Sequence, residues 1–286
     1  MQGQLDALQP LDSRQFHVAI KRLADSLSFG ADRSPFLGSG IEYAQSRLYV
    51  PGDPIRSIDW RVTARTQRVH VKEYEAPKQM PCWLLVDTSA SMVTGSTART
   101  KYATALHVAG GLAYAFLDRV SPCGVIGVGE RELRVEPTLS RQQALQWLLE
   151  LRTFRYDEAT SIARRCRELA ARLTNRAIIV ALTDLHETGA VASLKLLGQR
   201  HDVIVLRLRD PAERQILGAG IVRLREAETG RTFVTHGRAR LLDEESVEQE
   251  LRRAGIDRFT IDTDQPFAQK LRHFCRFRGM FGRGAR

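Results

Sequence analysis

Cys82-Trp83-Leu84-Leu85-Val86-Asp87-Thr88-Ser89-Ala90-Ser91-Met92 is the stretch of sequence from which the fold can be argued. Its first five residues form a continuous apolar run, which is expected of a β-strand that is buried on both faces. The runs 177–182 and 203–206 repeat this pattern. Strands of this kind belong to parallel sheets that helices cover on both sides.

Stretches with helical periodicity separate these runs. Helices are expected at about 98–119, 140–151, 160–173, 188–200, 244–254 and 265–276, and further strands at 124–128, 131–137 and 258–262. Ser140 and Gln143 have the spacing of a helix capping box. The alternation predicts an α/β fold with a doubly wound, mostly parallel sheet of Rossmann type. Residues 209–240 interrupt it, and a turn at 228–230 predicts a β-hairpin insertion there.

The first 80 residues follow other patterns. Residues 12–29 predict an amphipathic helix that presents Phe16, Ile20, Leu23 and Leu27 on one face. Residues 30–80 are rich in glycine and proline and predict turns and short strands rather than helices. We therefore expect residues 1–80 to pack on a main domain at 81–278, with a basic, solvated tail at 279–286.

Composition limits the possible classes of protein. The chain has 286 residues, 43% of them hydrophobic, and a net charge of +10, which suits an acidic protein surface, nucleic acid or an anionic membrane. The four cysteines form no C-x-x-C pair, so a zinc site is not expected, and we interpret Cys82, Cys123 and Cys166 as reduced packing residues. The N-terminus lacks the apolar core of a signal peptide, and no apolar run approaches about 20 residues, so we expect a cytoplasmic protein.

Oxygen-bearing side chains follow the first buried run. Asp87, Ser89 and Ser91 alternate, so their oxygens can point to one side of a loop. Asp184 stands just beyond the run 177–182, and the carboxyl ends of parallel strands form the ligand-binding edge of such sheets. These oxygens suit Mg²⁺ or Mn²⁺. Because the cage holds only two carboxylates, we expect weak binding that a carboxylate from another molecule completes.

A structural alternative exists for the same loop. Ser89 and Ser91 could simply cap the helix that follows, as serine commonly does. The buried strand before Asp87 and the second acid at the end of another strand favour the metal site.

The loop 87–92 resembles the first loop of the metal-ion-dependent adhesion site of von Willebrand factor A domains. The resemblance implies that the two serines and a threonine of a second loop bind the ion directly, while acids bind it directly or through water. Thr160 is the best match for this threonine, although Ala159 stands where the family usually has glycine, and Asp157 is a rival ligand. The acid of the third loop matches Asp184.

A second segment of the sequence resembles one particular family that contains such domains. Residues 49–60, with the sequence YVPGDPIRSIDW, and then 63–66 are similar to the signature of the bacterial "domain of unknown function 58" family. Residues 210–213 and 228–230 are similar to its later pattern, so the resemblance covers about 36–278. Members are typically encoded beside MoxR-type AAA+ ATPases. The resemblance implies action with such an ATPase in chaperone-like maturation or metal insertion, and it gives a fold and a partner rather than a reaction. Together with the metal loop, it leads us to expect a non-enzymatic, metal-dependent interaction module that promotes maturation or assembly of a client protein.

Residues 51–60 allow two interpretations. One is a rigid turn in which Arg56 pairs with Asp53 or Asp59 and Trp60 lies in a small core. The other is a docking face for the partner, formed by Tyr49, Gly52, Asp53, Arg56, Asp59 and Trp60.

The sequence leaves two alternatives to the interaction module. Haloacid-dehalogenase phosphatases need a second acid two positions after the nucleophilic aspartate, where Ser89 stands here. The sequence contains neither a phosphate-binding loop nor a G-x-S-x-G elbow. His186 lies near the predicted site, and we interpret it as a surface residue. No basic strand interleaved with aromatics of the RNA-binding type is present. A metal-dependent phosphoester hydrolase and a basic nucleic-acid-binding protein are therefore the alternatives.

Overall fold

The computed structural model describes residues 2–4, 13–28, 42–53, 55–75, 80–93, 95–155, 157–187, 189–214, 221–225, 232–236, 244–278 and 280. The chain divides into two compact units: residues 32–79 form the smaller one, and residues 1–31 and 80–286 form the larger one. Each unit is described by itself.

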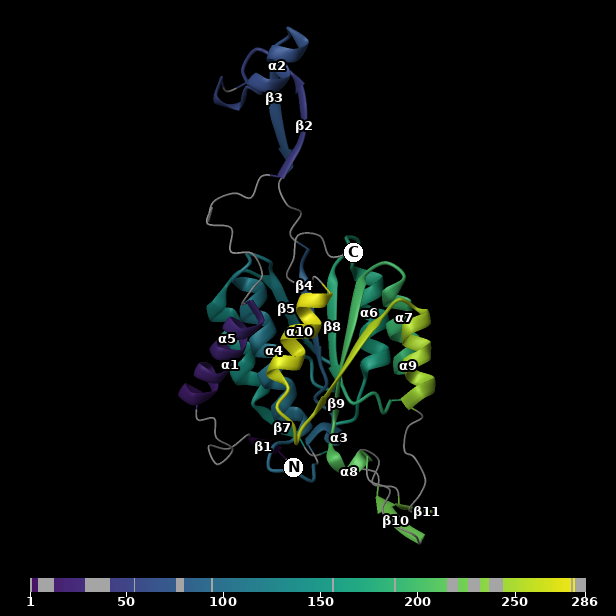
Figure 1. Cartoon of the computed structure of the whole chain (residues 1–286). Coiled ribbons are helices and arrows are strands. Elements are labelled where there is room, and N and C mark those ends of the chain that lie inside the picture. Colours follow the sequence, from purple (N-terminus) through teal and green to yellow (C-terminus); the bar gives the residue numbers. More distant parts are fainter. Residues whose placement is uncertain are drawn as a thin grey trace. The chain divides into compact units, whose positions relative to one another are not determined.

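A six-stranded sheet is the centre of the larger unit (Figure 1). Its strands lie in the order β12 (Asp257–Asp262), β9 (Asp202–Arg209), β8 (Ile178–Thr183), β4 (Cys82–Val86), β5 (Cys123–Gly127) and β6 (Arg134–Thr138). All neighbours run parallel except β5 and β6, which are antiparallel. This arrangement confirms the predicted doubly wound, mostly parallel sheet and is consistent with a von Willebrand A-type fold.

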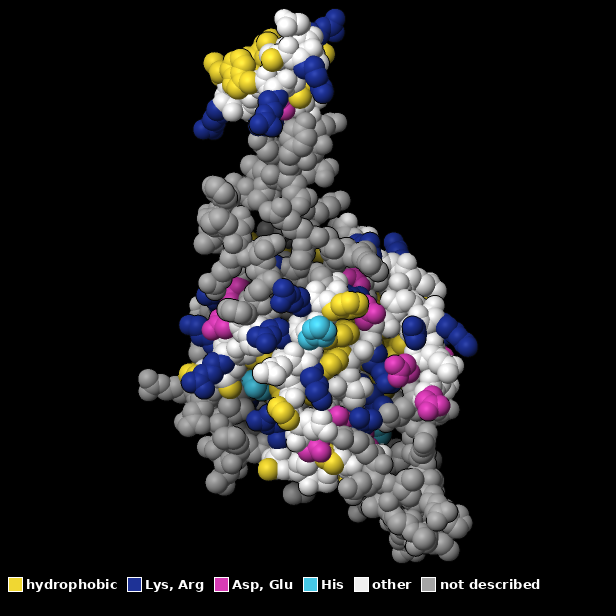
Figure 2. All heavy atoms as spheres, viewed as in Figure 1, with side chains coloured by type: hydrophobic (Ala, Val, Ile, Leu, Met, Phe, Trp, Pro, Cys, Tyr) yellow, Lys and Arg dark blue, Asp and Glu magenta, His cyan; other side chains and the backbone are white. Residues whose placement is uncertain are grey.

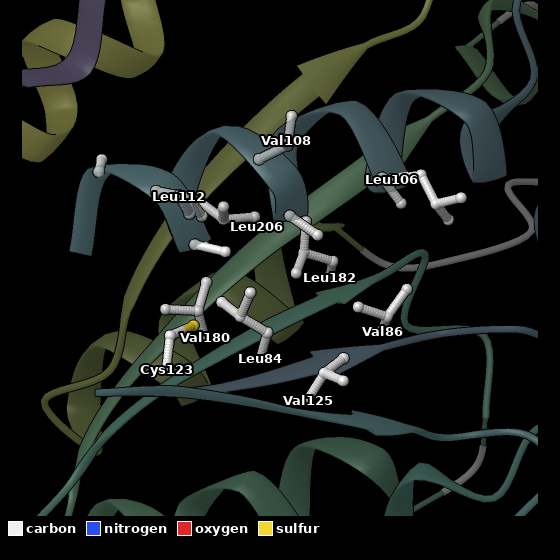
Figure 3. Packing of buried hydrophobic residues seen from close by; sticks show 14 of the residues in the cluster. Leu84, Val86, Leu106, Val108, Leu112, Cys123, Val125, Val180, Leu182 and Leu206 are labelled. Atoms are coloured by element: carbon white, nitrogen blue, oxygen red, sulfur yellow. The ribbon is translucent and has the colours of Figure 1, made fainter. Parts of the chain in front are cut away.

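Helices cover both faces of the sheet, as the apolar runs predict. The helices on one face are α1 (Ser13–Ser28), α4 (Lys101–Leu117), α5 (Arg141–Leu151) and α10 (Ala268–Phe277). On the other face are α6 (Ile162–Arg172), α7 (Ala190–Gly198) and α9 (Glu244–Arg253). Within β4, Leu84 and Val86 pack toward α4 (Figure 3), whereas Trp83 and Leu85 belong to the core on the opposite face.

The ends of two helices have side-chain caps. Thr100 Oγ1 accepts a hydrogen bond from Ala103 N at the start of α4, over 3.1 Å. Ser140 Oγ accepts one from Gln143 N at the start of α5, over 3.2 Å, as predicted. The backbone N–H of Ser140 donates to Thr138 Oγ1, a bond that the predicted capping box would have given to the Gln143 side chain.

The predicted amphipathic helix near the N-terminus is α1, and it packs on α4 in the larger unit. Ile20 and Leu23 lie against two glycines of α4. A Cβ atom added to Gly110 would lie 2.4 Å from Ile20 Cδ1, and one added to Gly111 would lie 2.6 Å from Leu23 Cδ2. Glycine therefore allows the two helices to approach closely here.

Short elements complete the larger unit. β1 (Gln2–Gln4) pairs antiparallel with β7 (Thr153–Arg155), and α3 (Ala90–Val93) and α8 (Pro211–Arg214) are single turns. β10 (Ile221–Arg225) and β11 (Thr232–His236) pair antiparallel and confirm the strands of the predicted hairpin insertion. The turn expected at 228–230 lies outside the described residues.

The cysteines and the C-terminal end join the core. All four cysteines are buried and form no disulfide, which agrees with the packing role predicted for Cys82, Cys123 and Cys166. Met280 is also buried in the core, and residues 281–286 of the expected tail lie outside the described residues. Of the helices described, none combines the length and the apolar composition that crossing a bilayer requires.

The smaller unit consists of an antiparallel pair of strands, β2 (Glu42–Leu48) and β3 (His70–Glu75), with a 3₁₀ turn η1 (Ile55–Ser57) and helix α2 (Trp60–Thr66) between them. The predicted short strands are confirmed, but the expectation that this segment lacks helices is wrong. Asp59 caps α2, because its Oδ1 accepts hydrogen bonds from the N–H groups of Arg61 and Val62. The packing of residues 30–80 on the main domain stays a prediction.

The rigid-turn interpretation of residues 51–60 is wrong in its details. Arg47 takes the place expected of Arg56, with Nη1 and Nη2 lying 2.7 and 2.8 Å from the carboxylate of Asp53. Trp60 is 67% exposed and so lies outside any core of this unit. Asp59 is 6% exposed and accepts a hydrogen bond from Ser46 Oγ as well as capping the helix.

Candidate metal centre

The predicted metal site lies where the strand order of the sheet reverses. The chain continues from β4 to β5 on one side, and β8 borders β4 on the other side. Asp87 directly follows β4 and Asp184 directly follows β8, so both side chains lie at the carboxyl edge of adjacent parallel strands. Such a switch point is the usual ligand site of open α/β sheets. Both acids are almost fully buried, at 1% and 2% exposure.

Hydrogen bonds from Thr183 and Ser89 hold the carboxylate of Asp87. Thr183 Oγ1 donates to Oδ2 over 2.7 Å, and the N–H of Ser89 donates to Oδ1 over 3.0 Å. Burial and, next, the charge of Asp184 raise the pKa of Asp87 to about 7. Two buried carboxylates repel each other in this way unless a cation offsets their charge.

The two serines link these acids. Ser89 Oγ lies 3.1 Å from Ser91 Oγ, and Ser91 in turn hydrogen-bonds the carboxylate of Asp184. Four of the five predicted ligands, Asp87, Ser89, Ser91 and Asp184, therefore lie in one connected cluster of oxygen atoms. Oxygen donors of this kind fit a hard divalent cation.

The second loop holds the two rival ligands, Thr160 and Asp157. Thr160 Oγ1 donates to Glu187 Oε2 over 3.3 Å, which places it beside the loop that follows β8. Its rival, Asp157, pairs with Arg155 over 3.3 Å and has a side chain that is 55% exposed. Asp157 is thus a largely exposed side chain, and the choice of Thr160 over Asp157 as the ligand of this loop stays a prediction.

Glu158 is a central residue that the sequence reasoning missed. Its fully buried carboxylate accepts hydrogen bonds from Thr88 Oγ1 and Arg131 Nε, each over 2.8 Å, and its backbone oxygen accepts one from Ala90 N over 2.8 Å. Glu158 thus ties the first loop to the second. Gly129 leaves the room for it, because a Cβ there would lie 2.0 Å from Glu158 Oε1.

Lys101 was also missed. Its ammonium lies 2.8 Å from Asp184 Oδ2 and 2.5 Å from Glu213 Oε1, with only 4% of the side chain exposed. Burial disfavours the charged form of Lys101, but the two carboxylates outweigh it and raise the pKa. Burial also opposes ionisation of Asp184, but the charges of Lys101 and His186 and the hydrogen bonds from Lys101 and Ser91 together outweigh it and lower the pKa. Lys101 therefore stays protonated beside a predicted metal ligand.

An acidic cluster next to Lys101 could also hold a metal ion. Ligand atoms of Asp184, His186 and Glu213 lie within 4.8 Å of one another. His186 Nε2 is 3.7 Å from Glu213 Oε2, so the interpretation of His186 as a plain surface residue was incomplete. The ammonium of Lys101 contacts both carboxylates of this cluster and would repel a second cation there. The hydroxyl-rich side of Asp184, toward Ser91, is therefore the better position for an ion.

Comparisons with known proteins support the family resemblance that residues 49–66 carry. The model of the family described as "Protein of unknown function DUF58" matches residues 45–252. Uncharacterized proteins of Mycobacterium tuberculosis and Mycobacterium bovis are 29% identical over 226 residues, which cover 76% of this chain and 70% of those proteins. The crystal structure of the Deinococcus radiodurans RO (RSR) protein matches 71% of this chain and 43% of its own, at 17% identity and a TM-score of 0.29. A likeness that low carries no argument here. The chain belongs to the DUF58 family.

Proposed function

We propose that this member of the DUF58 family is a metal-dependent protein-interaction module, in which Asp87, Ser89, Ser91, Thr160 and Asp184 hold Mg²⁺ or Mn²⁺. The observation that carries the proposal is the connected set of carboxylate and hydroxyl oxygens at the switch point of the sheet. A carboxylate from a partner would take a remaining coordination position. The site is poor in charge because Lys101 offsets part of the charge of Asp184, so binding of the ion and of the partner should support each other.

Binding suits the described residues better than catalysis does. Hydrolysis at Asp87 would need a second acid two positions later, and Ser89 stands there. The amine of Lys101 contacts Asp184, but its contacts with Asp184 and Glu213 raise its pKa and keep it from accepting a proton. A phosphoester hydrolase is therefore the second candidate.

The partner we propose is a MoxR-type AAA+ ATPase, with which the protein would promote chaperone-like maturation of a client protein in the cytoplasm. The family membership and the net charge of +10 support an acidic partner surface. Long-range attraction would speed association, whereas coordination of the partner's carboxylate would slow release.

The test measures metal and partner together. Titration with Mn²⁺, followed by calorimetry, should give one site in the native chain and in Asp118→Asn, a control at an exposed acid that pairs with Arg141. Asp87→Asn keeps the shape but should lose this site. On an immobilised ATPase, EDTA should raise the dissociation rate of the native protein at least tenfold, to that of Asp87→Asn. Equal metal binding and equal dissociation rates for the two variants would overturn the proposal.

The second candidate has its own outcome. Mn²⁺-dependent hydrolysis of p-nitrophenyl phosphate that Asp87→Asn abolishes and Asp118→Asn keeps would identify a hydrolase. We expect no turnover above that of the buffer.

A further inference from the structure

The smaller unit exposes large apolar side chains that its own fold leaves uncovered. Trp60 is 67% exposed and Ile55 is 72% exposed, and Leu48 and Val50 are each at least half exposed. Figure 2 shows hydrophobic side chains gathered on one side of this unit, with arginine and lysine side chains around them. Isolated exposed apolar residues are common, but a group of this size on so small a unit is typical of an interaction site.

The scaffold beneath these side chains is well ordered by hydrogen bonds. Arg47 holds both carboxylate oxygens of Asp53, and the N–H of Val50 donates to Asp53 Oδ2 over 2.9 Å. Asp59 caps α2 at the position just before Trp60. The exposed Trp60 is therefore the first residue of a capped helix, and its position does not depend on a loose loop.

The charge of this surface is one-sided. Between residues 46 and 72 the two acids, Asp53 and Asp59, are both engaged within the unit. Exposed cations in the same range are Arg56, Arg61, Arg65, Arg68 and Lys72. An apolar patch bordered by cations, with its acids turned inward, is complementary to an apolar patch bordered by carboxylates.

We propose that the apolar–basic surface of the smaller unit, defined by Leu48, Val50, Ile55, Trp60, Arg56, Arg61 and Arg65, docks a protein segment in which apolar side chains are flanked by carboxylates. Tryptophan and arginine are the residue types that dominate the binding energy of protein interfaces. Arginine, which outnumbers lysine here, pairs with carboxylates through two parallel hydrogen bonds. RNA would gain little from the aliphatic side chains, because it binds mainly through stacking and phosphate contacts.

Docking at this surface needs no metal ion and does not rest on the proposed function of the metal centre. The probe is a synthetic amphipathic helical peptide with leucines on one face and glutamates beside them. The matched control peptide has lysine in place of every glutamate. Poly(U) RNA and phosphatidylglycerol vesicles test the two other anionic partners.

Trp60 is a built-in reporter for the experiment. The other two tryptophans, Trp83 and Trp147, are each 1% exposed. In the full-length protein, the acidic peptide should therefore shift the emission of Trp60 to shorter wavelength and protect it from acrylamide quenching. EDTA should leave this response unchanged, and the lysine peptide should give none.

Variants test the residues through the anisotropy of a labelled acidic peptide. Trp60→Ala should weaken binding at least tenfold, as truncation of a central interface residue typically does. Arg61→Glu/Arg65→Glu should do the same, whereas Arg252→Glu/Arg253→Glu on α9, an equal charge change at exposed positions, should bind normally. All of these side chains are exposed, and circular dichroism checks that each variant folds. Tighter binding of RNA or vesicles, equal binding by all variants, or no binding of the acidic peptide would each overturn the proposal.

Discussion

Lys101 on α4 and Asp184 at the end of β8 form a buried ion pair, with Nζ 2.8 Å from Oδ2. The pair lies within the candidate metal centre, so one of its two acids already has a cationic neighbour. Breaking such a pair on one side is costly because the remaining charge is left buried. Removal of Lys101 alone should therefore destabilise the fold, and its charge lowers the attraction that the site has for a metal ion.

Replacing Lys101 should raise the affinity for metal. In Lys101→Met, Asp184 and Glu213 lose their ammonium partner, so a divalent cation becomes the group that offsets their charge. At about 5 Å and an effective dielectric constant of about 20, one unit charge changes an interaction by about 3 kcal/mol. We expect Mn²⁺ to bind at least tenfold more tightly in calorimetry, and the metal-free protein to be less stable. Lys195→Met, at an exposed pair with Glu250, is the control, and unchanged affinity in Lys101→Met would contradict the prediction.

Glu158 should matter for stability although it is not a predicted ligand. In Glu158→Gln the amide keeps the shape, but one hydrogen bond to Thr88 or Arg131 is lost or reversed in a fully buried place. A loss of about 1–3 kcal/mol in the free energy of unfolding is expected, measured by urea denaturation. Glu136→Gln changes an exposed pair with Arg134 and should stay near the native value. Equal stability of both variants would show that the Glu158 network contributes little.

The close contact of α1 with α4 predicts the effect of a larger side chain. In Gly110→Leu the new side chain would overlap with Ile20, which is 1% exposed. We expect a loss of about 1–3 kcal/mol in the free energy of unfolding, as for other overpacked cores. Ala171→Leu also introduces a leucine, at an exposed position of α6, and should cost little. A Gly110→Leu protein as stable as Ala171→Leu would mean that α1 does not pack as described.

His107 predicts a dependence of stability on pH. Burial lowers its pKa below the ordinary 6.5, with a hydrogen bond to Ala19 O opposing the shift and Arg99 adding to it. The unfolded chain therefore binds a proton at His107 before the folded protein does, and stability is lost as the pH falls below about 6.5. One such group contributes at most about 1.4 kcal/mol per pH unit.

Urea denaturation between pH 7.5 and 5.5 measures this effect. In His107→Gln the loss of stability on acidification should be smaller than in the native protein. In His273→Gln, at an exposed histidine of α10, it should equal that of the native protein. If the free energy of unfolding of His107→Gln depended on pH as in the native protein, other groups would be the cause of the acid sensitivity.

The sheet could be predicted because its physical cause is local in the sequence. β4 and β8 are buried on both faces, and continuous apolar runs are the direct result. The site acids could be predicted from topology, since Asp87 and Asp184 each follow such a run. Helix α2 was not predicted, because the glycines and prolines near it are typical of turns. Asp59, directly before Trp60, is nevertheless a recognisable helix start.

Lys101, Glu158 and Glu213 could not be predicted in the same way. Lys101 and Asp184 are 83 residues apart, and Glu158 and Thr88 are 70 residues apart. No periodicity connects positions at such separations. Each side chain stands near the end of an ordinary helix or in a loop, where charged residues are common, so only the folded arrangement distinguishes it.

The burial of the four cysteines should make the native protein unreactive toward thiol reagents. Burial raises the pKa of Cys166 to about 12, and it also raises the pKa values of Cys82 and Cys275, so little thiolate forms at neutral pH. A cysteine introduced at the exposed Ala171 or Ala64 would react with maleimides far faster than any native one. A single dye or spin label can therefore be attached to either unit without removing a native cysteine.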